Sequence, residues 1–463
     1  MIAATVDDIT SSTQPSSAPA ADPRRFAVLA CFCLHSAFQN FCFMNFATDQ
    51  DLVNKMLGEP SALENLLLSY GAFAATLPAM ICSMWLLLRG YDRSAGLIMS
   101  VLIVLGAWLR YAAEVSHSYA YALISTVVLG LAGGVIFTSI TFLPARWFPA
   151  SERAFATALA AQSNYLGWAI GAINPIMLGK PAPDGEHTEE GMHVFLLCQA
   201  IAVTLLLPLH LMINVRGPIH AVAQGDDKPD EPTMGVVQTF RLLLRRPQYL
   251  IHCGCYALLG AVGYAVPEVV ETCFSAVLPN ATDASFTPDE SMWSNVAFIA
   301  PGVVVGILSG KLVPERHYGT AVRAMAVLGA AALLTIQILL LIAQRGSIGK
   351  DEIYGLATFL MALAGAGTLG FINIAMRVAI KIGHPADEIY AGSIIEFFLL
   401  AISCALGLLT VAVDAKNTFW FFSLPACLAA GGVILCARFE PPAARVDLTD
   451  GLLGGVATSP SVR

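Results

Sequence analysis

The chain has 463 residues, of which 56% are apolar and only 13% charged, and its mean hydropathy is +0.68. These values lie outside the range of soluble globular proteins and indicate a polytopic membrane protein. The net charge of −8 argues against a nucleic-acid partner, because binding the phosphate backbone requires clustered Lys and Arg.

Twelve apolar segments are long enough to cross a bilayer, which takes roughly 20 residues in a helix. These segments are 26–47, 66–88, 95–113, 119–143, 155–178, 193–214, 249–275, 292–311, 321–344, 353–379, 389–413 and 418–437. The sequence therefore predicts an all-α membrane protein with twelve transmembrane helices.

One long polar connection divides the predicted helices into six and six. The predicted organisation is a disordered cytoplasmic N-terminus at 1–25, a six-helix bundle at 26–214, a linker at 215–248, a second six-helix bundle at 249–437 and a cytoplasmic tail at 438–463. The polar N-terminal stretch lacks the apolar core of a cleaved signal peptide.

The distribution of basic residues predicts the orientation, since Lys and Arg in short loops stay on the cytoplasmic side. With both termini cytoplasmic, few of the 25 Lys and Arg residues fall on the other face, namely Lys55, Arg110, Lys180, Arg345, Lys350 and Lys416. The sequon at Asn280 then lies outside and is a glycosylation candidate. The C-terminus carries no retention signal, so we expect the plasma membrane.

Two short motifs recur at equivalent places in the two halves. Pro149-Ala150-Ser151-Glu152 after the fourth span matches Pro385-Ala386-Asp387-Glu388 after the tenth. The basic turns LLLRGYDR (86–93) and GKLVPERHYG (310–319) both resemble the Gly-x-x-x-Asp-Arg loop of major facilitator transporters. Parallel six-helix repeats of this kind predict the major facilitator fold.

Longer stretches resemble the feline leukaemia virus subgroup C receptor-related family, and the likeness covers most of the chain. The stretches are SAFQNF (36–41), LGAWLR (105–110), 143–175, CYALLGAVGYAVPE (255–268) and HPADEIYAGSIIEF (384–397). The resemblance implies a transporter of choline, ethanolamine or a related small metabolite, with haem export also attributed to family members.

The resemblance further implies a substrate cage with a Trp in span one, a Gln in span five, an aromatic residue in span seven and a Gln in span eleven. Here those positions carry Asn40, Tyr165, Tyr264 and Leu399, with Glu396 one turn before the last. A quaternary ammonium group is bound by aromatic faces. Replacing the Trp by Asn40 therefore weakens a choline assignment, while Tyr165 partly restores it.

Polar residues at membrane depth are costly and usually face a cavity, so each is a candidate for substrate binding. The set is Gln39, Asn40, Gln162, Tyr165, Tyr264 and Glu396. Glu396 fits the countercharge of a cationic substrate or a proton carrier, and the alternative is a bond between helices. The amides of Gln39 and Asn40 also suit bonds between helices, and Trp168 suits either packing or a cavity wall.

Two further positions leave alternatives open. Glu268, directly after Pro267, suits either an outer cation funnel or a solvated helix end. His252 suits either haem ligation or a hydrogen bond within the bundle.

A set of charges at the predicted cytoplasmic helix ends is expected to gate the transporter. These residues are Arg146, Glu152, Arg153, Arg316, Arg377 and Glu388. Ion pairs among them would close the inner gate and break during alternating access. The alternative is that they only orient the chain.

No cofactor and no metal are expected, and the protein is not expected to be an enzyme. Cys31 and Cys33, like Cys253 and Cys255, are two residues apart on a helix and point to different faces. A phosphate-binding Gly-x-x-x-x-Gly-Lys loop is also missing from the sequence.

We predict a monomeric carrier in a lipid bilayer that moves a small organic solute, such as a choline-like or ethanolamine-like cation. The alternatives are a haem exporter, a carrier of an amino acid or vitamin, and a non-transporting receptor.

Overall fold

The computed structural model describes residues 22–46, 50–177, 189–213, 236–277, 288–344, 350–414 and 417–436. A long helix corresponds to each of the twelve predicted spans. These helices are α1 (Arg25–Phe43), α3 (Ala62–Leu88), α4 (Asp92–Val115), α5 (Tyr119–Trp147), α6 (Ala150–Ala172), α8 (Glu189–Ile213), α10 (Pro247–Val277), α11 (Pro288–Leu312), α12 (Tyr318–Gln344), α13 (Lys350–Gly383), α14 (Glu388–Leu409) and α15 (Thr418–Cys436). The predicted all-α membrane fold is confirmed.

Shorter helices that the sequence analysis did not predict connect or flank the long ones. They are η1 (Met44–Phe46), α2 (Gln50–Leu57), α7 (Asn174–Met177), α9 (Val236–Leu244), η2 (Glu315–His317) and η3 (Thr410–Ala412). Helix α9 falls within the stretch 215–248 that was predicted to be a linker.

Eleven of the described helices are long and apolar enough to cross a membrane, and α6 is the long helix that falls short. Its 23 residues are rich in Ala and carry Gln162, Ser163 and Asn164 in succession. All three polar side chains are buried inside the bundle. Protein contacts rather than lipid therefore surround the polar part of α6.

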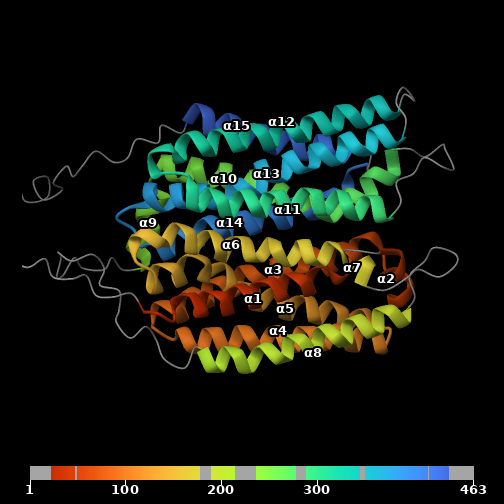
Figure 1. Ribbon diagram of the computed structural model, residues 1–463, viewed down its shortest axis with the longest axis horizontal. Coiled ribbons are helices and arrows are strands. Elements are labelled where there is room, and N and C mark those ends of the chain that lie inside the picture. The colour runs from red at the N-terminus through yellow and green to blue at the C-terminus, as the bar shows by residue number, and fades with distance from the viewer. Residues whose placement is uncertain are drawn as a thin grey trace, which may run out of the picture.

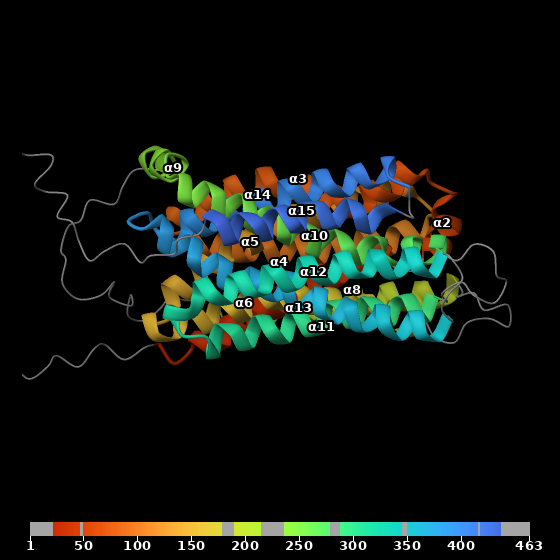
Figure 2. The same ribbon diagram turned by 90° about the horizontal axis from the view of Figure 1, so that it is seen from above.

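The helices form two packed halves, called here the first half (α1 to α8) and the second half (α9 to α15). In Figure 1 the first half, red to yellow-green, lies below the second half, green to blue, and Figure 2 shows all the long helices running side by side. The halves meet where α6 packs on α11 and where α14 packs on α3 and α5. Any solute path between the halves is bounded by these helices.

Glycines allow this close packing between the halves. A Cβ added to Gly306 of α11 would lie 2.1 Å from the Gln162 side chain of α6. A Cβ added to Gly392 of α14 would lie 2.4 Å from Thr141 of α5. Neither contact leaves room for a larger residue, so the helices approach through these glycines.

The repeated motif places equivalent acidic residues at two helix starts. Pro149 precedes α6, and Asp387 precedes α14, where its side chain accepts a hydrogen bond from the Ile389 amide (3.1 Å). Glu152 and Glu388 consequently lie in the first turns of α6 and α14, where a negative charge is favourable. We call this end of the bundle, with the α5–α6 and α13–α14 turns, the basic end.

Candidate functional site

Aromatic rings from both halves meet in the middle of the bundle. Tyr264 of α10 contacts Trp168 (4.8 Å between ring centroids) and Tyr165 (5.3 Å), both on α6. Phe73 of α3 contacts Tyr264 at 5.5 Å, and Phe43 of α1 stacks on Trp168 at 5.9 Å. These five residues form the aromatic cluster, and the rings of Tyr165, Trp168 and Tyr264 are at most 2% exposed.

Glu396 of α14 lies next to this cluster and is 2% exposed. Its Oε1 accepts a hydrogen bond from the Tyr256 hydroxyl at 2.5 Å. Its Oε2 has no hydrogen-bond partner among the described residues. Tyr165 and Tyr264 both lie within the electrostatic range of this carboxylate. The centre therefore holds one acidic group with an unused oxygen beside aromatic faces.

The predicted amides contribute to the site in different ways. Asn40 accepts a hydrogen bond from the Trp168 indole (3.0 Å) and donates one to the Ser36 carbonyl (2.9 Å). Gln39 donates to the Leu129 carbonyl (3.0 Å), which ties α1 to α5. Gln162 donates across the halves to the Leu369 carbonyl of α13 (3.3 Å). The structure thus brings Asn40 to the aromatic cluster and uses Gln39 and Gln162 to join helices.

At the basic end, one carboxylate joins the two halves. Glu388 Oε1 lies 3.4 Å from Arg153 Nη1 of the first half, and Glu388 Oε2 lies 3.4 Å from Arg377 Nη1 of the second half. We call these three residues the inter-half charge cluster. All three are largely shielded from solvent, with side-chain exposures of 10 to 26%.

The other residues of the predicted gating set lie outside this cluster. Arg146 pairs with Asp92 (2.8 Å) and Glu152 pairs with Arg25 (2.8 Å), so both pairs stay inside the first half. Arg316 lies on the exposed turn η2, where its Nε contacts the ring of His317 (3.1 Å). The sequence pattern grouped these residues by position along the chain, whereas the pairing depends on which helix ends face each other.

Arg110 of α4 is a candidate that the sequence analysis missed. It had been counted among the cations of the outer face, yet its side chain is 0% exposed. It reaches the Thr126 hydroxyl (3.4 Å) and the Phe46 ring (4.3 Å), while its Nε and Nη1 have no hydrogen-bond partner among the described residues. A buried, incompletely bonded cation inside a membrane bundle is a functional candidate.

Two residues with open alternatives are now placed. Glu268 is 8% exposed and lies within the electrostatic range of Arg110, so of its two alternatives the solvated helix end is wrong. His252 is buried, and its Nε2 lies 2.7 Å from the Ala375 carbonyl, as expected for a hydrogen-bonded histidine. Asn280, the glycosylation candidate, lies outside the described residues.

The described part of the chain has twelve long helices in two halves, with a polar and aromatic centre where the halves meet. This arrangement defines the two-bundle class of membrane transport proteins. The chain belongs to the Major Facilitator Superfamily, whose family model matches residues 28–408.

Individual relatives narrow the branch within this superfamily. The chain is 26% identical over 298 residues to the solute carrier family 49 member 4 homolog of Xenopus tropicalis, which covers 64% of each chain. It is 25% identical over 257 residues to the choline/ethanolamine transporter FLVCR2 of Homo sapiens, covering 53% of this chain and 47% of the relative. The matches span less than two thirds of these relatives. They confirm the resemblance to the feline leukaemia virus subgroup C receptor-related family.

Solved structures show the same fold at low sequence identity. The outward-facing structure of the transporter FucP matches with a TM-score of 0.59 and 15% identity, covering 90% of this chain and 100% of the other. A bacterial homolog of the human lysosomal transporter Spinster, in an inward-facing state, matches with a TM-score of 0.61 and 15% identity, covering 91% and 98%. These TM-scores establish the fold. Because the two are nearly equal, they favour neither the outward-facing nor the inward-facing state.

Proposed function

We propose that this transporter carries a small organic cation of the choline or ethanolamine type by alternating access, with Glu396 as the countercharge. The observation that carries the proposal is the buried Glu396 carboxylate, whose Oε2 has no partner among the described residues. An ionised carboxylate at this depth is costly unless it is paired. A cationic substrate would provide the pairing.

The aromatic cluster supports the same substrate class. A quaternary or primary ammonium group is attracted by the faces of Trp and Tyr rings within about 6 Å. The first span of this chain carries Asn40 where the resemblance implies a Trp. Trp168 supplies an indole to the cluster from α6, and Asn40 accepts its N–H. Relatives named choline/ethanolamine transporters agree with this substrate class.

The closed packing supports a mechanism of alternating access. The rings of Tyr165, Trp168 and Tyr264 fill the centre, and the inter-half charge cluster joins the halves at the basic end. Admitting a solute from the basic end requires Glu388 to release Arg153, because this pair is the one in the cluster that crosses between the halves. Admitting it from the other end requires the aromatic rings to separate.

The orientation and location are part of the proposal. The basic end is assigned to the cytoplasm of a plasma-membrane protein, as positive charge in short loops favours. Glycosidase treatment of protein from mammalian cells should then shift the wild-type band and leave Asn280→Gln unchanged. If the chain is not glycosylated and the basic end can be labelled from outside the cell, the proposed orientation is wrong and the opposite one holds.

The test is uptake of labelled choline and of labelled ethanolamine in cells that lack their own carriers, at two external pH values. Glu396→Gln is the main variant, because a Gln side chain still accepts the Tyr256 hydrogen bond but removes the charge. Glu114→Gln is the matched control. Glu114 is also a buried carboxylate, and it pairs with His193 (2.8 Å) away from the central site.

Saturable uptake that disappears in Glu396→Gln, with surface expression and the Glu114→Gln activity retained, is the expected result. The pH response of uptake would be compared among the wild type, Glu114→Gln and Glu396→Gln. Its loss in Glu396→Gln alone, with measurable residual uptake, would add proton coupling to the role of Glu396. Wild-type protein at the surface without uptake of either cation would overturn the substrate class. Labelled haem and a metabolite mixture would then be tested in the same cells.

A further inference from the structure

A second polar cluster lies in the first half, between α1 and α8. The side chains of Cys31, His35 and His210 are all buried, and one ligand atom from each lies within 4.8 Å of the others. Cys31 and His35 are one helical turn apart on α1, and His210 comes from the last turn of α8. A thiol and two imidazoles thus converge from two helices. Cys31 and His210 are 179 residues apart in the sequence.

The spacing of these atoms fits a shared metal ion. Cys31 Sγ lies 3.9 Å from His210 Nδ1, and one ring nitrogen of His35 completes a group of ligand atoms that all lie within 4.8 Å of one another. Metal–sulfur bonds of about 2.3 Å and metal–nitrogen bonds of about 2.0 Å place sulfur and nitrogen roughly 3.6 to 3.8 Å apart around one ion. Small side-chain movements would therefore complete the site.

His35 is already oriented as a metal ligand would be. Its Nδ1 lies 2.8 Å from the Cys31 carbonyl, to which it donates, so Nε2 carries the lone pair. That Nε2 is buried and has no hydrogen-bond partner among the described residues. Metal-binding histidines usually donate their second N–H to a carbonyl or carboxylate in this way.

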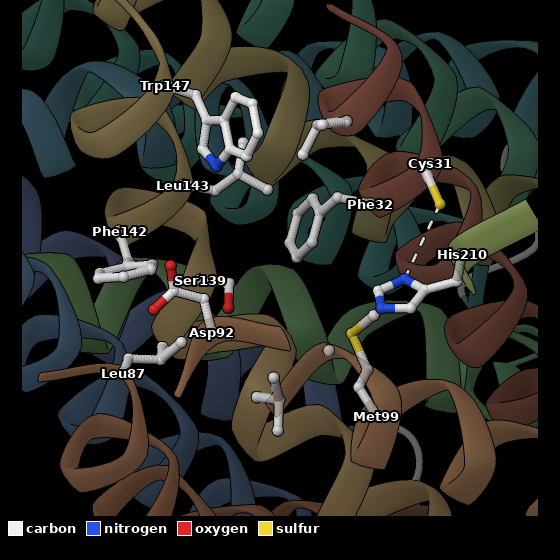
Figure 3. A pocket seen from close by; sticks show the side chains of 13 residues that line it. Cys31, Phe32, Leu87, Asp92, Met99, Ser139, Phe142, Leu143, Trp147 and His210 are labelled. Atoms are coloured by element: carbon white, nitrogen blue, oxygen red, sulfur yellow. Dashed lines mark hydrogen bonds between the residues drawn. The ribbon is translucent and has the colours of Figure 1, made fainter. Parts of the chain in front are cut away.

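A small cavity leads to the cluster. Its volume is about 60 Å³, and its lining includes Cys31, His210, Met99 and Asp92. Figure 3 shows the Met99 sulfur beside the His210 ring and the Asp92 carboxylate on the far side of the cavity. Asp92 Oδ1 is buried and unpartnered among the described residues, while Oδ2 pairs with Arg146. The unpartnered oxygen is therefore one polar group that lines the cavity.

The ligand types select the kind of ion. Thiolate sulfur suits both Cu(I) and zinc, imidazole suits copper and zinc alike, and thioether sulfur is a soft donor that suits Cu(I). Three close ligands with a Met sulfur nearby fit the low coordination number of a monovalent soft ion. The cavity is too small for a porphyrin, so haem does not fit this site.

We propose that Cys31, His35 and His210 form a Cu(I) site that clamps α1 to α8, separate from the central substrate site. This proposal departs from the expectation of no metal, which rested on the spacing of Cys31 and Cys33 and of Cys253 and Cys255. The Cys-x-x-x-His spacing of Cys31 and His35 was the available sequence signal. Nothing in the sequence placed His210 beside it.

Purified full-length protein in detergent, loaded with Cu(I) under anaerobic reducing conditions, provides the test. Retention against a colorimetric Cu(I) chelator gives the stoichiometry and affinity, and X-ray absorption gives the ligands. The wild type is expected to hold one Cu(I) per chain with sulfur and nitrogen ligands. Cu(I) should also raise the melting temperature, because a ligand that binds only the folded state stabilises it.

The variants make the result specific to this cluster. Cys31→Ser and His210→Ala should weaken Cu(I) binding by at least about tenfold, and His210→Cys should restore it. Cys33→Ser is the matched control, because Cys33 lies on the same helix and contacts the Leu159 carbonyl instead. Monodisperse elution of each variant shows that it is folded.

Cu(I) binding that is equal in wild type and Cys31→Ser, or a wild type that retains no Cu(I), would overturn the proposal. Zn(II) retained in place of Cu(I) would overturn the assignment of the ion. Neither result would affect the central site, because choline uptake is measured independently of Cu(I) binding.

Discussion

The Trp168 indole donates a hydrogen bond to the Asn40 side chain at 3.0 Å, and this bond joins α6 to α1 inside the aromatic cluster. Asn40 is itself fixed by its bond to the Ser36 carbonyl. The position that lacks the Trp implied by the family resemblance therefore orients a different Trp. We expect this bond to keep the Trp168 face directed toward Tyr264.

A double-mutant cycle of Asn40→Ala and Trp168→Phe should reveal coupling. Each single change is expected to lower kcat/KM for choline uptake, and the double variant should be little worse than either. The expected coupling is about 1 kcal/mol, as for one buried hydrogen bond. Additive losses would show that Asn40 does not act through Trp168, and Asn45→Ala, which removes a bond to Gln199 instead, serves as the control.

Glu388→Gln should weaken closure of the basic end. Removing the shared charge leaves Arg153 and Arg377 without their common partner and costs the closed state about 1 kcal/mol. Spin labels at Ser151 and His384, both exposed, should report a larger share of long distances. Glu315→Gln is the control, because the Glu315–Lys381 pair lies within the second half. An unchanged distance distribution in Glu388→Gln would argue that the cluster does not hold the halves together.

Gly306→Ala should destabilise the contact between α6 and α11. The added Cβ would displace the Gln162 side chain, which would then lose its bond to Leu369. Overpacking of this kind costs roughly 1 to 3 kcal/mol, so the melting temperature of the purified protein should fall. Gln162→Ala in the same chain should restore it.

The control for this prediction is Gly355→Ala. A Cβ at Gly355 of α13 meets nothing within 4 Å, so its melting temperature should stay that of the wild type. If Gly306→Ala and Gly355→Ala behave alike, close approach of α6 and α11 is not what requires the glycine.

Arg110→Met should preserve folding and reduce transport. The Arg110 side chain is fully buried with two nitrogens unbonded among the described residues, so removing its charge relieves a desolvation cost. Losing the attraction to the buried Glu268 opposes this gain, so we expect thermal stability to change little, together with a loss of uptake of more than about tenfold, as for a functional intramembrane charge. If Arg110→Met has a lower thermal stability but takes up substrate normally when a ligand stabilises it, a functional role of Arg110 is contradicted.

Sequence reasoning located the helices well because hydrophobic thickness constrains every membrane span in the same way. It also grouped Asn40, Tyr165, Tyr264 and Glu396, which the structure places in and around one centre. The pairing of charges was less predictable, since Arg146 meets Asp92 rather than an acidic residue of the other half. Such contacts depend on the rotation of each helix, which a single sequence specifies weakly.

The buried residues that the sequence analysis missed all depend on how the helices pack, not on the local sequence. Arg110 was counted as an outer cation because positive-inside counting ignores which side of a helix a residue occupies. The Cys31, His35 and His210 cluster required the packing of α8 on α1, which no local pattern encodes. Long-range convergence of single side chains is what the structure adds to the sequence.

The low hydropathy of α6 is expected to affect how this chain enters the membrane. A segment carrying Gln162, Ser163 and Asn164 together is a poor substrate for insertion by hydrophobicity alone. It becomes acceptable at membrane depth once α1 and α11 surround its polar face. Because α11 belongs to the second half, we expect a truncated first half to leave part of the polar face of α6 uncovered and exposed to cellular quality control.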